Sequence, residues 1–349
     1  MSAPHDRPGE LREEDAFDTA AVTAWLKSQV DGLGELLEVR QYPGGASNLT
    51  YLLRFAEREL ILRRPPAGQK AKSAHDMQRE YRVQSRLRPV YPFVPEVLAM
   101  CTDPAVLGSD FYVMERLDGI ILRGDLPEGM TLSEQDARAL AFRTFDRLIE
   151  LHQVDADAAG LGDLGKGAGY VARQVGGWSQ RYRRARTPNV PQAEDVIAWV
   201  DANQPDDVAI CVIHNDFRFD NVVLSESLDV LGVLDWEMAT LGDPLMDLAG
   251  SLTYWTQADD DDMAQLMRKQ PSHLPGMPTR RELMEYYCER TGLSAGNWTF
   301  YEVFGAFRLA VIMQQIYYRY HAGQTHNPAF AELHRFVGYL LDRCRAGMA

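Results

Sequence analysis

Four polar residues stand where two apolar runs end, in the middle of the chain. The stretch VIHNDFRFDNVVL contains His214, Asp216 and Asn221, and the stretch VLGVLDWEMATLGDP contains Asp235. Both runs are rich in β-branched residues, so each predicts a buried strand followed by a polar turn. We expect the two strands to end side by side, which would gather both aspartates and the asparagine at one rim.

These side chains suit magnesium and phosphate chemistry. Two carboxylates and a carboxamide offer oxygen donors, which Mg²⁺ prefers, and Mg²⁺ usually completes its shell with phosphate and water. In phosphoryl transfer the metal bridges phosphate oxygens, while a further aspartate accepts the proton of the attacking hydroxyl. Aspartate and asparagine are also common in ordinary turns. The spacing HxDxxxxN alone therefore does not distinguish a turn from a site, and the later Asp235 favours the site.

The elements around this centre divide the chain into two parts. Strand-like runs at 36–42, 49–55 and 59–64 have short connections, which predicts antiparallel hairpins, and 111–117 predicts a further strand. A helical pattern covers DTAAVTAWLKSQV near the N-terminus, and Ser73 with Asp76 predicts the start of a second helix. From about residue 118 the pattern is mainly helical, and Thr131 with Glu134 predicts a capping box there.

Composition and charge exclude several classes of protein. The 349 residues are 46% hydrophobic and 25% charged, as in an ordinary globular protein, and the net charge of −14 disfavours a nucleic-acid partner. The four cysteines are scattered without a CxxC pair, which is typical of a reducing compartment. No apolar leader opens the sequence and no run of eighteen apolar residues occurs. We expect a cytoplasmic protein without a membrane span.

The order of the motifs resembles the aminoglycoside phosphotransferase and choline-kinase-like family, distant relatives of protein kinases. The likeness covers roughly residues 20–340 and is greatest for the kinase-like domain found fused to acyl-CoA dehydrogenases. It is carried by YPGGASNLTYLL, ILRRPP, HDMQREYRVQSRL, FYVMERLDG, HNDFRFDNVVL and VLDWEMATLGDPLMDLA. It implies an α+β, bilobal protein-kinase-like fold. The expected lobes are a small antiparallel-sheet lobe at 1–117 that binds nucleotide, with the N-terminal helix, and a larger helical lobe at 118–349.

The resemblance also implies roles in the central motif. Asp216 would be the catalytic base, while Asn221 and Asp235 would hold magnesium and His214 would bond the backbone of the loop. Arg218 would either neutralise charge on the transferring phosphoryl group or hold the loop. Outside this motif, Asp247 would anchor the catalytic loop.

The nucleotide would be ATP. The glycines of PGGASN permit a backbone that cradles phosphate, although a plain hairpin turn explains them equally well. Arg63 occupies the place of the kinase lysine, and Glu80, on the apolar face of its helix, needs a cationic partner that Arg63 could provide. The backbone of Glu115 and Leu117 would bind the adenine edge. The predicted nucleotide-binding residues are Gly45, Ser47, Asn48, Arg63, Glu80, Glu115 and Leu117.

The acceptor would be a small hydroxylated molecule bound by the helical lobe. Candidate contacts are Trp255, Arg308 and Gln315, although most aromatic stripes on helices are simply core. Arg308 and Arg319 lie in a stretch without acids, which favours an anionic and partly apolar compound such as a hydroxy acid or hydroxyacyl-CoA. The alternative acceptors are an aminoglycoside, another amino alcohol or a sugar. The alternative functions are a nucleotide-binding pseudokinase and a metal-dependent hydrolase.

Overall fold

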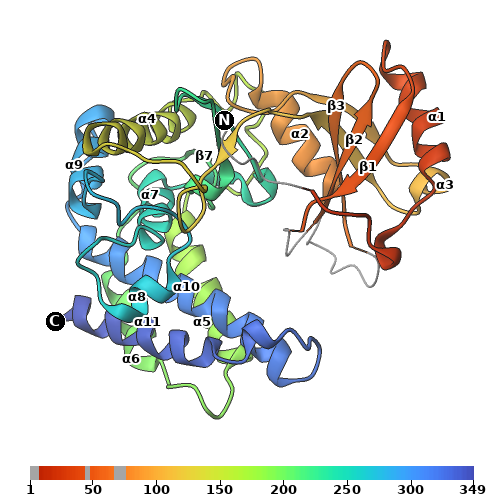
Figure 1. Ribbon diagram of the computed structural model, residues 1–349. Coiled ribbons are helices and arrows are strands. Elements are labelled where there is room, and N and C mark those ends of the chain that lie inside the picture. The colour runs from red at the N-terminus through yellow and green to blue at the C-terminus, as the bar shows by residue number, and fades with distance from the viewer. Residues whose placement is uncertain (1–7, 44–47, 67–75) are drawn as a thin grey trace.

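The computed structural model describes residues 8–43, 48–66 and 76–349, and the chain folds into two lobes (Figure 1). Two of the residues expected to cradle phosphate, Gly45 and Ser47, lie outside the described residues, and so does Ser73. The α+β bilobal architecture predicted from the sequence is confirmed. A small antiparallel sheet forms one lobe and helices dominate the other.

The smaller lobe is built on a five-stranded antiparallel sheet with strand order β1-β2-β3-β5-β4. In register, Leu53 of β2 lies opposite Leu60 of β3, and Leu62 of β3 lies opposite Val113 of β5. The short connection at residues 56–58 joins β2 to β3, as the sequence predicts. The strands are β1 (Leu36–Gln41), β2 (Leu49–Phe55), β3 (Glu59–Arg64), β4 (Val97–Cys101) and β5 (Phe111–Glu115).

Alternating side chains of this sheet enter two different cores, because successive residues of a strand point to opposite faces. Leu60 and Leu62 belong to the core that includes Leu26 of α1 (Thr19–Gln29). Ile61, between them, belongs to the core that includes Met77 of α2 (Met77–Leu87). The sheet is therefore covered on one face by α1 and on the other by α2. The short elements of this lobe are η1 (Glu13–Asp15) and α3 (Pro104–Leu107).

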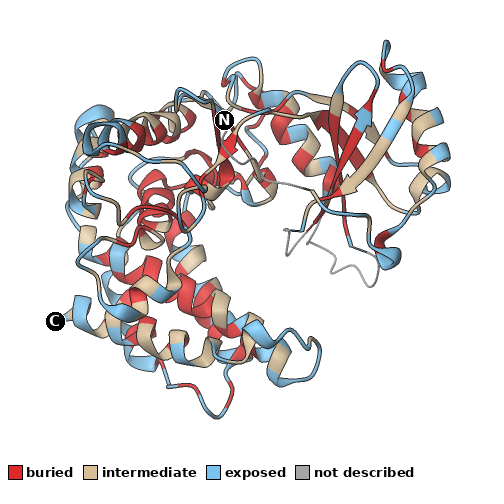
Figure 2. Cartoon of the chain, viewed as in Figure 1, coloured by how far each residue is buried: buried red, intermediate tan, exposed pale blue. Residues whose placement is uncertain are grey.

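The larger lobe packs its helices around one extensive core (Figure 2). Its longest helix is α10 (Trp298–His321), which contacts α11 (Leu333–Met348), α5 (Tyr170–Ala185) and α7 (Pro244–Thr253). The remaining helices are α4 (Glu134–His152), α6 (Glu194–Asn203), α8 (Asp262–Met267), α9 (Arg280–Thr291) and η4 (Pro328–Phe330). The predicted boundary at 117/118 stays a prediction, but it falls between β5 and β6 (Ile120–Ile121), and β6 pairs with β8 (Val222–Leu224).

The strands that carry the central motif do not pair as the sequence analysis expected. β7 (Cys211–Ile213) pairs antiparallel with β10 (Thr240–Gly242). β9 (Val230–Val233) pairs instead with β8, in a sheet of order β6-β8-β9. The two apolar runs thus belong to separate small sheets, so the expectation of a side-by-side pair is wrong. The single-turn elements η2 (Phe219–Asn221) and η3 (Trp236–Met238) follow the polar turns.

Helix starts are set by caps that the sequence locates within two or three residues. Helix α2 begins after Asp76, whose carboxylate accepts a hydrogen bond from the backbone N–H of Arg79. Helix α4 begins after Ser133, whose hydroxyl accepts from the N–H of Asp136. The predicted capping box at Thr131 is therefore wrong, because the first helical residue is Glu134. Among the described residues, no helix is long and apolar enough to cross a membrane.

Candidate active site

A cavity of about 420 Å³ lies where the two lobes meet. The smaller lobe lines it with Asn48, Thr50, Ile61 and Arg63, together with the strand end from Met114 to Leu117. The larger lobe contributes five polar residues of the central motif. These are Asp216, Arg218, Asp220, Asn221 and Asp235. The predicted catalytic and metal-binding residues thus share one cavity with Asn48, Arg63, Glu115 and Leu117 of the predicted nucleotide site.

The loop that carries Asp216 is tied together by its own side chains. The Nδ2 of Asn221 donates to both the backbone oxygen and the Oδ2 of Asp216, at 2.8 and 3.1 Å. The backbone N–H of Asp216 donates to Nδ1 of His214, whose Nε2 lies 3.0 Å from the carbonyl oxygen of Leu234. His214 is fully buried, so it connects the Asp216 loop with the end of β9, as the resemblance implies.

Asp247, in the first turn of α7, anchors the same loop through its backbone. Its carboxylate accepts hydrogen bonds from the backbone N–H groups of His214 and Asn215, both at 2.7 Å. The Nε2 of His152 lies 3.1 Å from the same carboxylate, and Nδ1 of His152 lies 2.6 Å from the hydroxyl of Tyr287. Burial tends to raise the pKa of Asp247, but the hydrogen bonds and nearby histidines outweigh it and hold this pKa below the usual range. The buried carboxylate is therefore charged and orders the loop.

Asn221 and Asp235 offer the oxygen donors that a magnesium ion would need. Both line the cavity beside Asp216, and the side chain of Asp235 is 34% exposed, so its carboxylate is accessible to a ligand. The described residues hold no cluster of three or more His, Cys, Asp or Glu side chains arranged as a metal site. Mg²⁺ does not require one, since it takes one or two carboxylates and fills its shell with phosphate and water. The donor set fits that ion.

Arg63 on β3 bridges the two lobes through ion pairs. Its NH1 lies 3.0 Å from Oε1 of Glu80 on α2, and its NH2 lies 3.0 Å from Oδ1 of Asp235. Burial lowers the pKa of a guanidinium, but Glu80, Tyr112 and Asp235 raise the pKa of Arg63 well above its ordinary value. Burial raises the pKa of Glu80, and Arg63 opposes that shift. The predicted partner of Glu80 is thus confirmed as Arg63.

The turn after Asp235 is also held by the smaller lobe. Asp235 adopts a left-handed backbone, with φ of 67°, at the start of η3. The guanidinium of Arg79 on α2 donates to the carbonyl oxygens of Glu237 and Ala239. The Nδ2 of Asn48 donates to Oε2 of Glu237 at 2.9 Å. The position of Asp235 therefore depends on contacts from both lobes.

Arg218 lies between two acids at the floor of the cavity. Its NH2 is 3.2 Å from Oδ2 of Asp216, its Nε is 3.1 Å from Oδ1 of Asp220, and its Cζ lies 4.5 Å from the centre of the Tyr254 ring. Burial lowers the pKa of Arg218 and the two aspartates more than reverse that effect. Burial raises the pKa of Asp220 despite Arg218. The guanidinium is thus held in contact with Asp216, where it balances the charge of that carboxylate.

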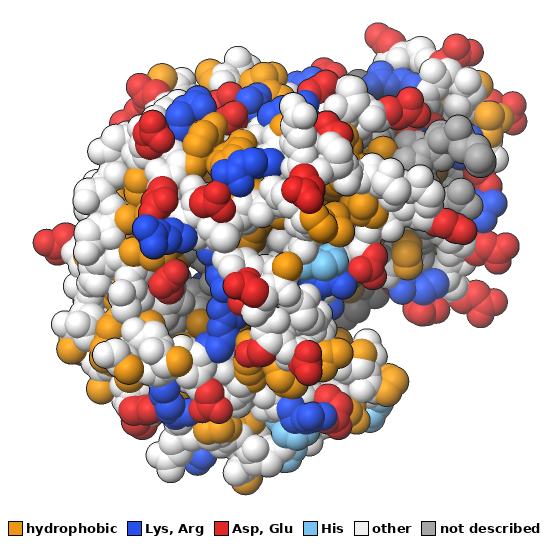
Figure 3. Space-filling view, turned by 60° about the vertical axis from the view of Figure 1, so that its left-hand side comes forward, with side chains coloured by type: hydrophobic (Ala, Val, Ile, Leu, Met, Phe, Trp, Pro, Cys, Tyr) orange, Lys and Arg blue, Asp and Glu red, His pale blue; other side chains and the backbone are white. Residues whose placement is uncertain are grey.

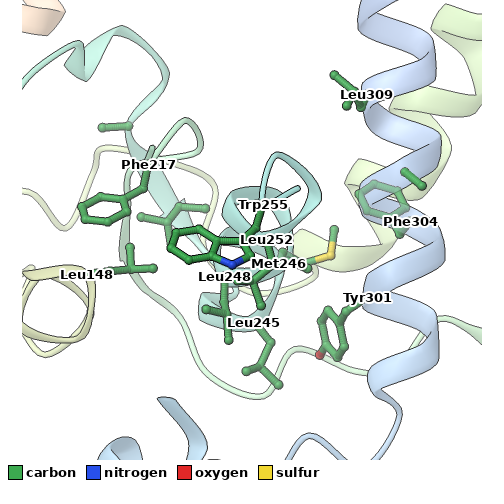
Figure 4. Packing of buried hydrophobic residues seen from close by; sticks show 14 of the residues in the cluster. Leu148, Phe217, Leu245, Met246, Leu248, Leu252, Trp255, Tyr301, Phe304 and Leu309 are labelled. Atoms are coloured by element: carbon green, nitrogen blue, oxygen red, sulfur yellow. The ribbon is translucent and has the colours of Figure 1, made fainter. Parts of the chain in front are cut away.

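The substrate candidates from the sequence lie in three different environments. Trp255 is buried in the core of the larger lobe, near Phe217 and Leu252, and its ring N–H donates to the carbonyl oxygen of Pro278 (Figure 4). Gln315 is exposed on α10. Arg308 donates to the carbonyl oxygen of Asn215 at 2.9 Å, directly beside Asp216. Arg308 thus bonds the backbone of the Asp216 loop, whereas Trp255 packs against Phe219 of the same loop, with ring centroids 5.7 Å apart.

Sequence reasoning missed several residues that shape the site. Arg79, His152 and Tyr287 were not singled out as site residues, although the side chain of His152 is buried in contact with Asp247. Gln270 fixes the loop from another side, since its Oε1 accepts from the N–H of Phe219 and its Nε2 donates to the carbonyl oxygen of Tyr254. Gln270 is buried, but the polar stretch RKQPSH around it gives no sign of that in the sequence.

Comparison with known proteins agrees with this geometry. Residues 38–284 match the model of the phosphotransferase enzyme family. Acyl-CoA dehydrogenase family member 10 of Mus musculus is 35% identical over 329 residues, which cover 93% of this chain and 30% of that protein. Family member 11 of Homo sapiens is 34% identical over 326 residues, 90% of this chain and 41% of that protein. The chain therefore spans less than half of these relatives.

Solved structures share the fold over nearly the whole chain. A Ralstonia eutropha protein assigned as an aminoglycoside phosphotransferase superposes with a TM-score of 0.80 and 29% identity, covering 95% of this chain and 98% of that one. A choline kinase from Cryptosporidium parvum has a TM-score of 0.64 and 11% identity, with 95% of both chains covered. At that identity the second likeness concerns the fold alone.

Proposed function

The chain belongs to the phosphotransferase enzyme family, and on that premise we propose that it is a kinase that transfers the γ-phosphoryl group of ATP to the hydroxyl of a small molecule. One observation carries the proposal. Asp216, Asn221 and Asp235 line the same cavity as Arg63, which is paired with Glu80. This set supplies a base, oxygen ligands for magnesium and a cation for phosphate, the parts that phosphoryl transfer requires.

The base of the reaction is Asp216. The acceptor oxygen forms a bond to the γ-phosphorus, the bond from that phosphorus to its bridging oxygen breaks, and the hydroxyl proton passes to the carboxylate of Asp216. Asn221 holds this carboxylate through its Nδ2, while Arg218 contacts Oδ2. Arg218 thus lies close enough to the reacting groups to offset the charge on the transferring phosphoryl group as well as to orient the base.

The nucleotide is held from the smaller lobe. Arg63 would contact the phosphates, and the backbone of Glu115 and Leu117, at the edge of the cavity, would bond the adenine. Asn221 and Asp235 would hold magnesium, which supplies charge neutralisation at the phosphate oxygens. Asp235 contacts Arg63 at 3.0 Å, so the same carboxylate aligns the arginine with the metal ligands.

The acceptor is a hydroxylated compound that carries a negative charge, such as a hydroxy acid or its CoA thioester. Arg308, at the carbonyl of Asn215, is the charged side chain of the substrate candidates that reaches the catalytic loop. The relatives of this chain include acyl-CoA dehydrogenase family members, which supports an acyl compound. The net charge of −14 does not oppose this, because acidic and basic side chains are interspersed over the face in Figure 3.

An acceptor panel tests the proposal. The purified protein, ATP and Mg²⁺ are incubated with free hydroxy acids, hydroxyacyl-CoA thioesters, kanamycin-type aminoglycosides, choline and simple sugars, and ADP formation and phosphorylated product are measured. We expect turnover with the hydroxy acids or thioesters and none with the amines. If an aminoglycoside is phosphorylated efficiently and the hydroxy acids are not, the proposed acceptor is wrong and the kinase mechanism stands. Tight ATP binding without turnover of any compound in the panel would indicate a pseudokinase.

A further inference from the structure

Two arginines of different helices flank one tryptophan beside the catalytic loop. Trp178 lies on α5 and is 7% exposed. The Cζ of Arg181, one turn further along α5, lies 4.4 Å from the centre of its ring, and the Cζ of Arg308 on α10 lies 5.5 Å from it. The indole N–H donates to Oε1 of Gln174, which fixes the ring. A rigid aromatic surface thus brings two guanidinium groups together.

This arrangement leaves two positive charges without an acidic partner. Within residues 8–43, 48–66 and 76–349, no Asp or Glu forms an ion pair with Arg181 or Arg308 within 4.0 Å. Arg183, two residues further along α5, does have such a partner, since it pairs with Glu194 at 2.5 Å. Burial and the neighbouring charge of Arg308 both lower the pKa of Arg181. Two like charges on one ring repel each other, so a bound anion would lower the energy of both.

The position of the pair relates it to the reaction. One N–H of Arg308 is used on the carbonyl oxygen of Asn215, the residue before Asp216, and a guanidinium has five such donors. Its NH1 is close to α7, since a Cβ built on Gly250 would lie 3.1 Å from it. Arg181 is exposed, so its donors face a solvent-accessible surface. An anion held here would lie next to the loop that carries the base.

We propose that Arg181 and Arg308, on the ring of Trp178, form a subsite for the carboxylate or phosphate of the acceptor. The proposal rests on the function proposed above and specifies how that acceptor is oriented. Planar guanidinium groups bind carboxylate and phosphate oxygens with paired N–H donors. Trp178 is itself buried and holds the two guanidinium groups in place. The subsite fixes the anionic end of the acceptor, and the hydroxyl end is then directed to Asp216.

The first test measures binding without catalysis. The probes are octanoate, an acyl carboxylate without a hydroxyl, and its neutral analogue octanol, titrated by calorimetry into the intact protein. The discriminating variant is Arg181→Gln, because Arg308 also holds the loop. The matched control is Arg184→Gln, which removes an exposed charge from the same helix. We expect Arg181→Gln to weaken octanoate binding by about tenfold, the loss of one charge-assisted hydrogen bond, and to leave octanol unchanged.

The results separate the subsite from the kinase assignment. Coenzyme A, which carries phosphates and no acyl carboxylate, is titrated as a third probe. The subsite is overturned if wild-type protein binds neither octanoate nor coenzyme A, or if Arg181→Gln and Arg184→Gln bind each of these two anions equally well. If Arg181→Gln loses coenzyme A binding and keeps octanoate binding, the subsite holds the phosphates of a thioester. If it loses octanoate binding and keeps coenzyme A binding, the subsite holds a free carboxylate. In turnover assays, Arg181→Gln should raise KM for the anionic acceptor and leave KM for ATP unchanged. If the wild-type protein binds the probes but does not turn over ATP, the proposed kinase function is refuted and the subsite stands.

Discussion

Substitution of the buried Asp247 tests how the loop that carries Asp216 is held in place. The Asp247 carboxylate accepts the backbone N–H groups of His214 and Asn215 at 2.7 Å and lies 3.1 Å from Nε2 of His152. In Asp247→Asn the better orientation keeps an oxygen toward His214 and His152 and turns the NH₂ group toward Asn215. One buried N–H then loses its acceptor, and the remaining bonds lose the charge that strengthens them.

The expected cost follows from these contacts. An unsatisfied buried donor costs about 1–3 kcal/mol, and the weakening of the other bonds adds to it, so the free energy of unfolding should fall by about 2–4 kcal/mol. Chemical denaturation of the variant, of wild type and of the exposed control Asp206→Asn measures this difference. The kcat should fall because the base is displaced, while ATP affinity should hold because Asp247 does not contact the smaller lobe.

The same pair of proteins gives a pH signature. The pKa of Asp247 is depressed in the folded state, so its contribution to stability is present above the unfolded pKa and is lost as pH falls through the folded one. The stability gap between wild type and Asp247→Asn should therefore narrow in acid, below the usual range of aspartate. Equal stability at neutral pH, or a proportional loss of kcat and ATP affinity, would refute the anchoring role.

Other substitutions address the remaining parts of the site. Asp216→Asn should reduce turnover by about 10²–10⁴-fold while ATP binding survives, and retention of half the activity would locate the base elsewhere. Asp235→Ala should weaken Mg·ATP binding in calorimetry, and unchanged affinity would remove the metal assignment. Glu80→Gln leaves buried Arg63 with one acid instead of two and should lower stability by about 1–3 kcal/mol in urea unfolding, whereas a stabilised variant would contradict the pairing. Burial raises the pKa of Asp243 to about 6, so the stability that this residue contributes at low pH is lost as pH rises through that value. Asp243→Asn should therefore make the free energy of unfolding depend less steeply on pH in this range. An unchanged pH dependence would assign it to another group.

Much of the fold and part of the site could be predicted, because the signals are local. The alternation of apolar residues identifies the strands of the smaller lobe, and an acid on the apolar face of α2 demands a cation, which Arg63 provides at 3.0 Å. The residues that were missed carry no local signal. His152 comes to Asp247 from one other helix and Tyr287 to His152 from a second, and nothing in the sequence around either residue indicates these contacts.

The pairing of β7 and β9 could not be predicted for a different reason. Apolar, β-branched residues indicate that a strand is buried, but they do not specify its partner. β10 has three residues, Thr240–Gly242, and its sequence reads as a turn between the aspartate motif and α7. The capping error is similar: Thr131 and Ser133 are both good caps, and only the backbone geometry at Ser133 decides between them.

Asp216, Asn221 and Asp235 nevertheless line one cavity, because hydrogen bonds between the loops replace the expected strand pair. The N–H of Leu234 donates to the carbonyl oxygen of Asn221 at 2.7 Å, and Nε2 of His214 reaches the carbonyl oxygen of Leu234 at 3.0 Å. These two contacts fix the residue before Asp235 to both ends of the Asp216 loop. The side chains that converge therefore do not depend on which strand each apolar run pairs with. Their convergence depends on one buried histidine and one backbone contact, so the spacing of the polar residues predicts which side chains meet better than it predicts the sheet.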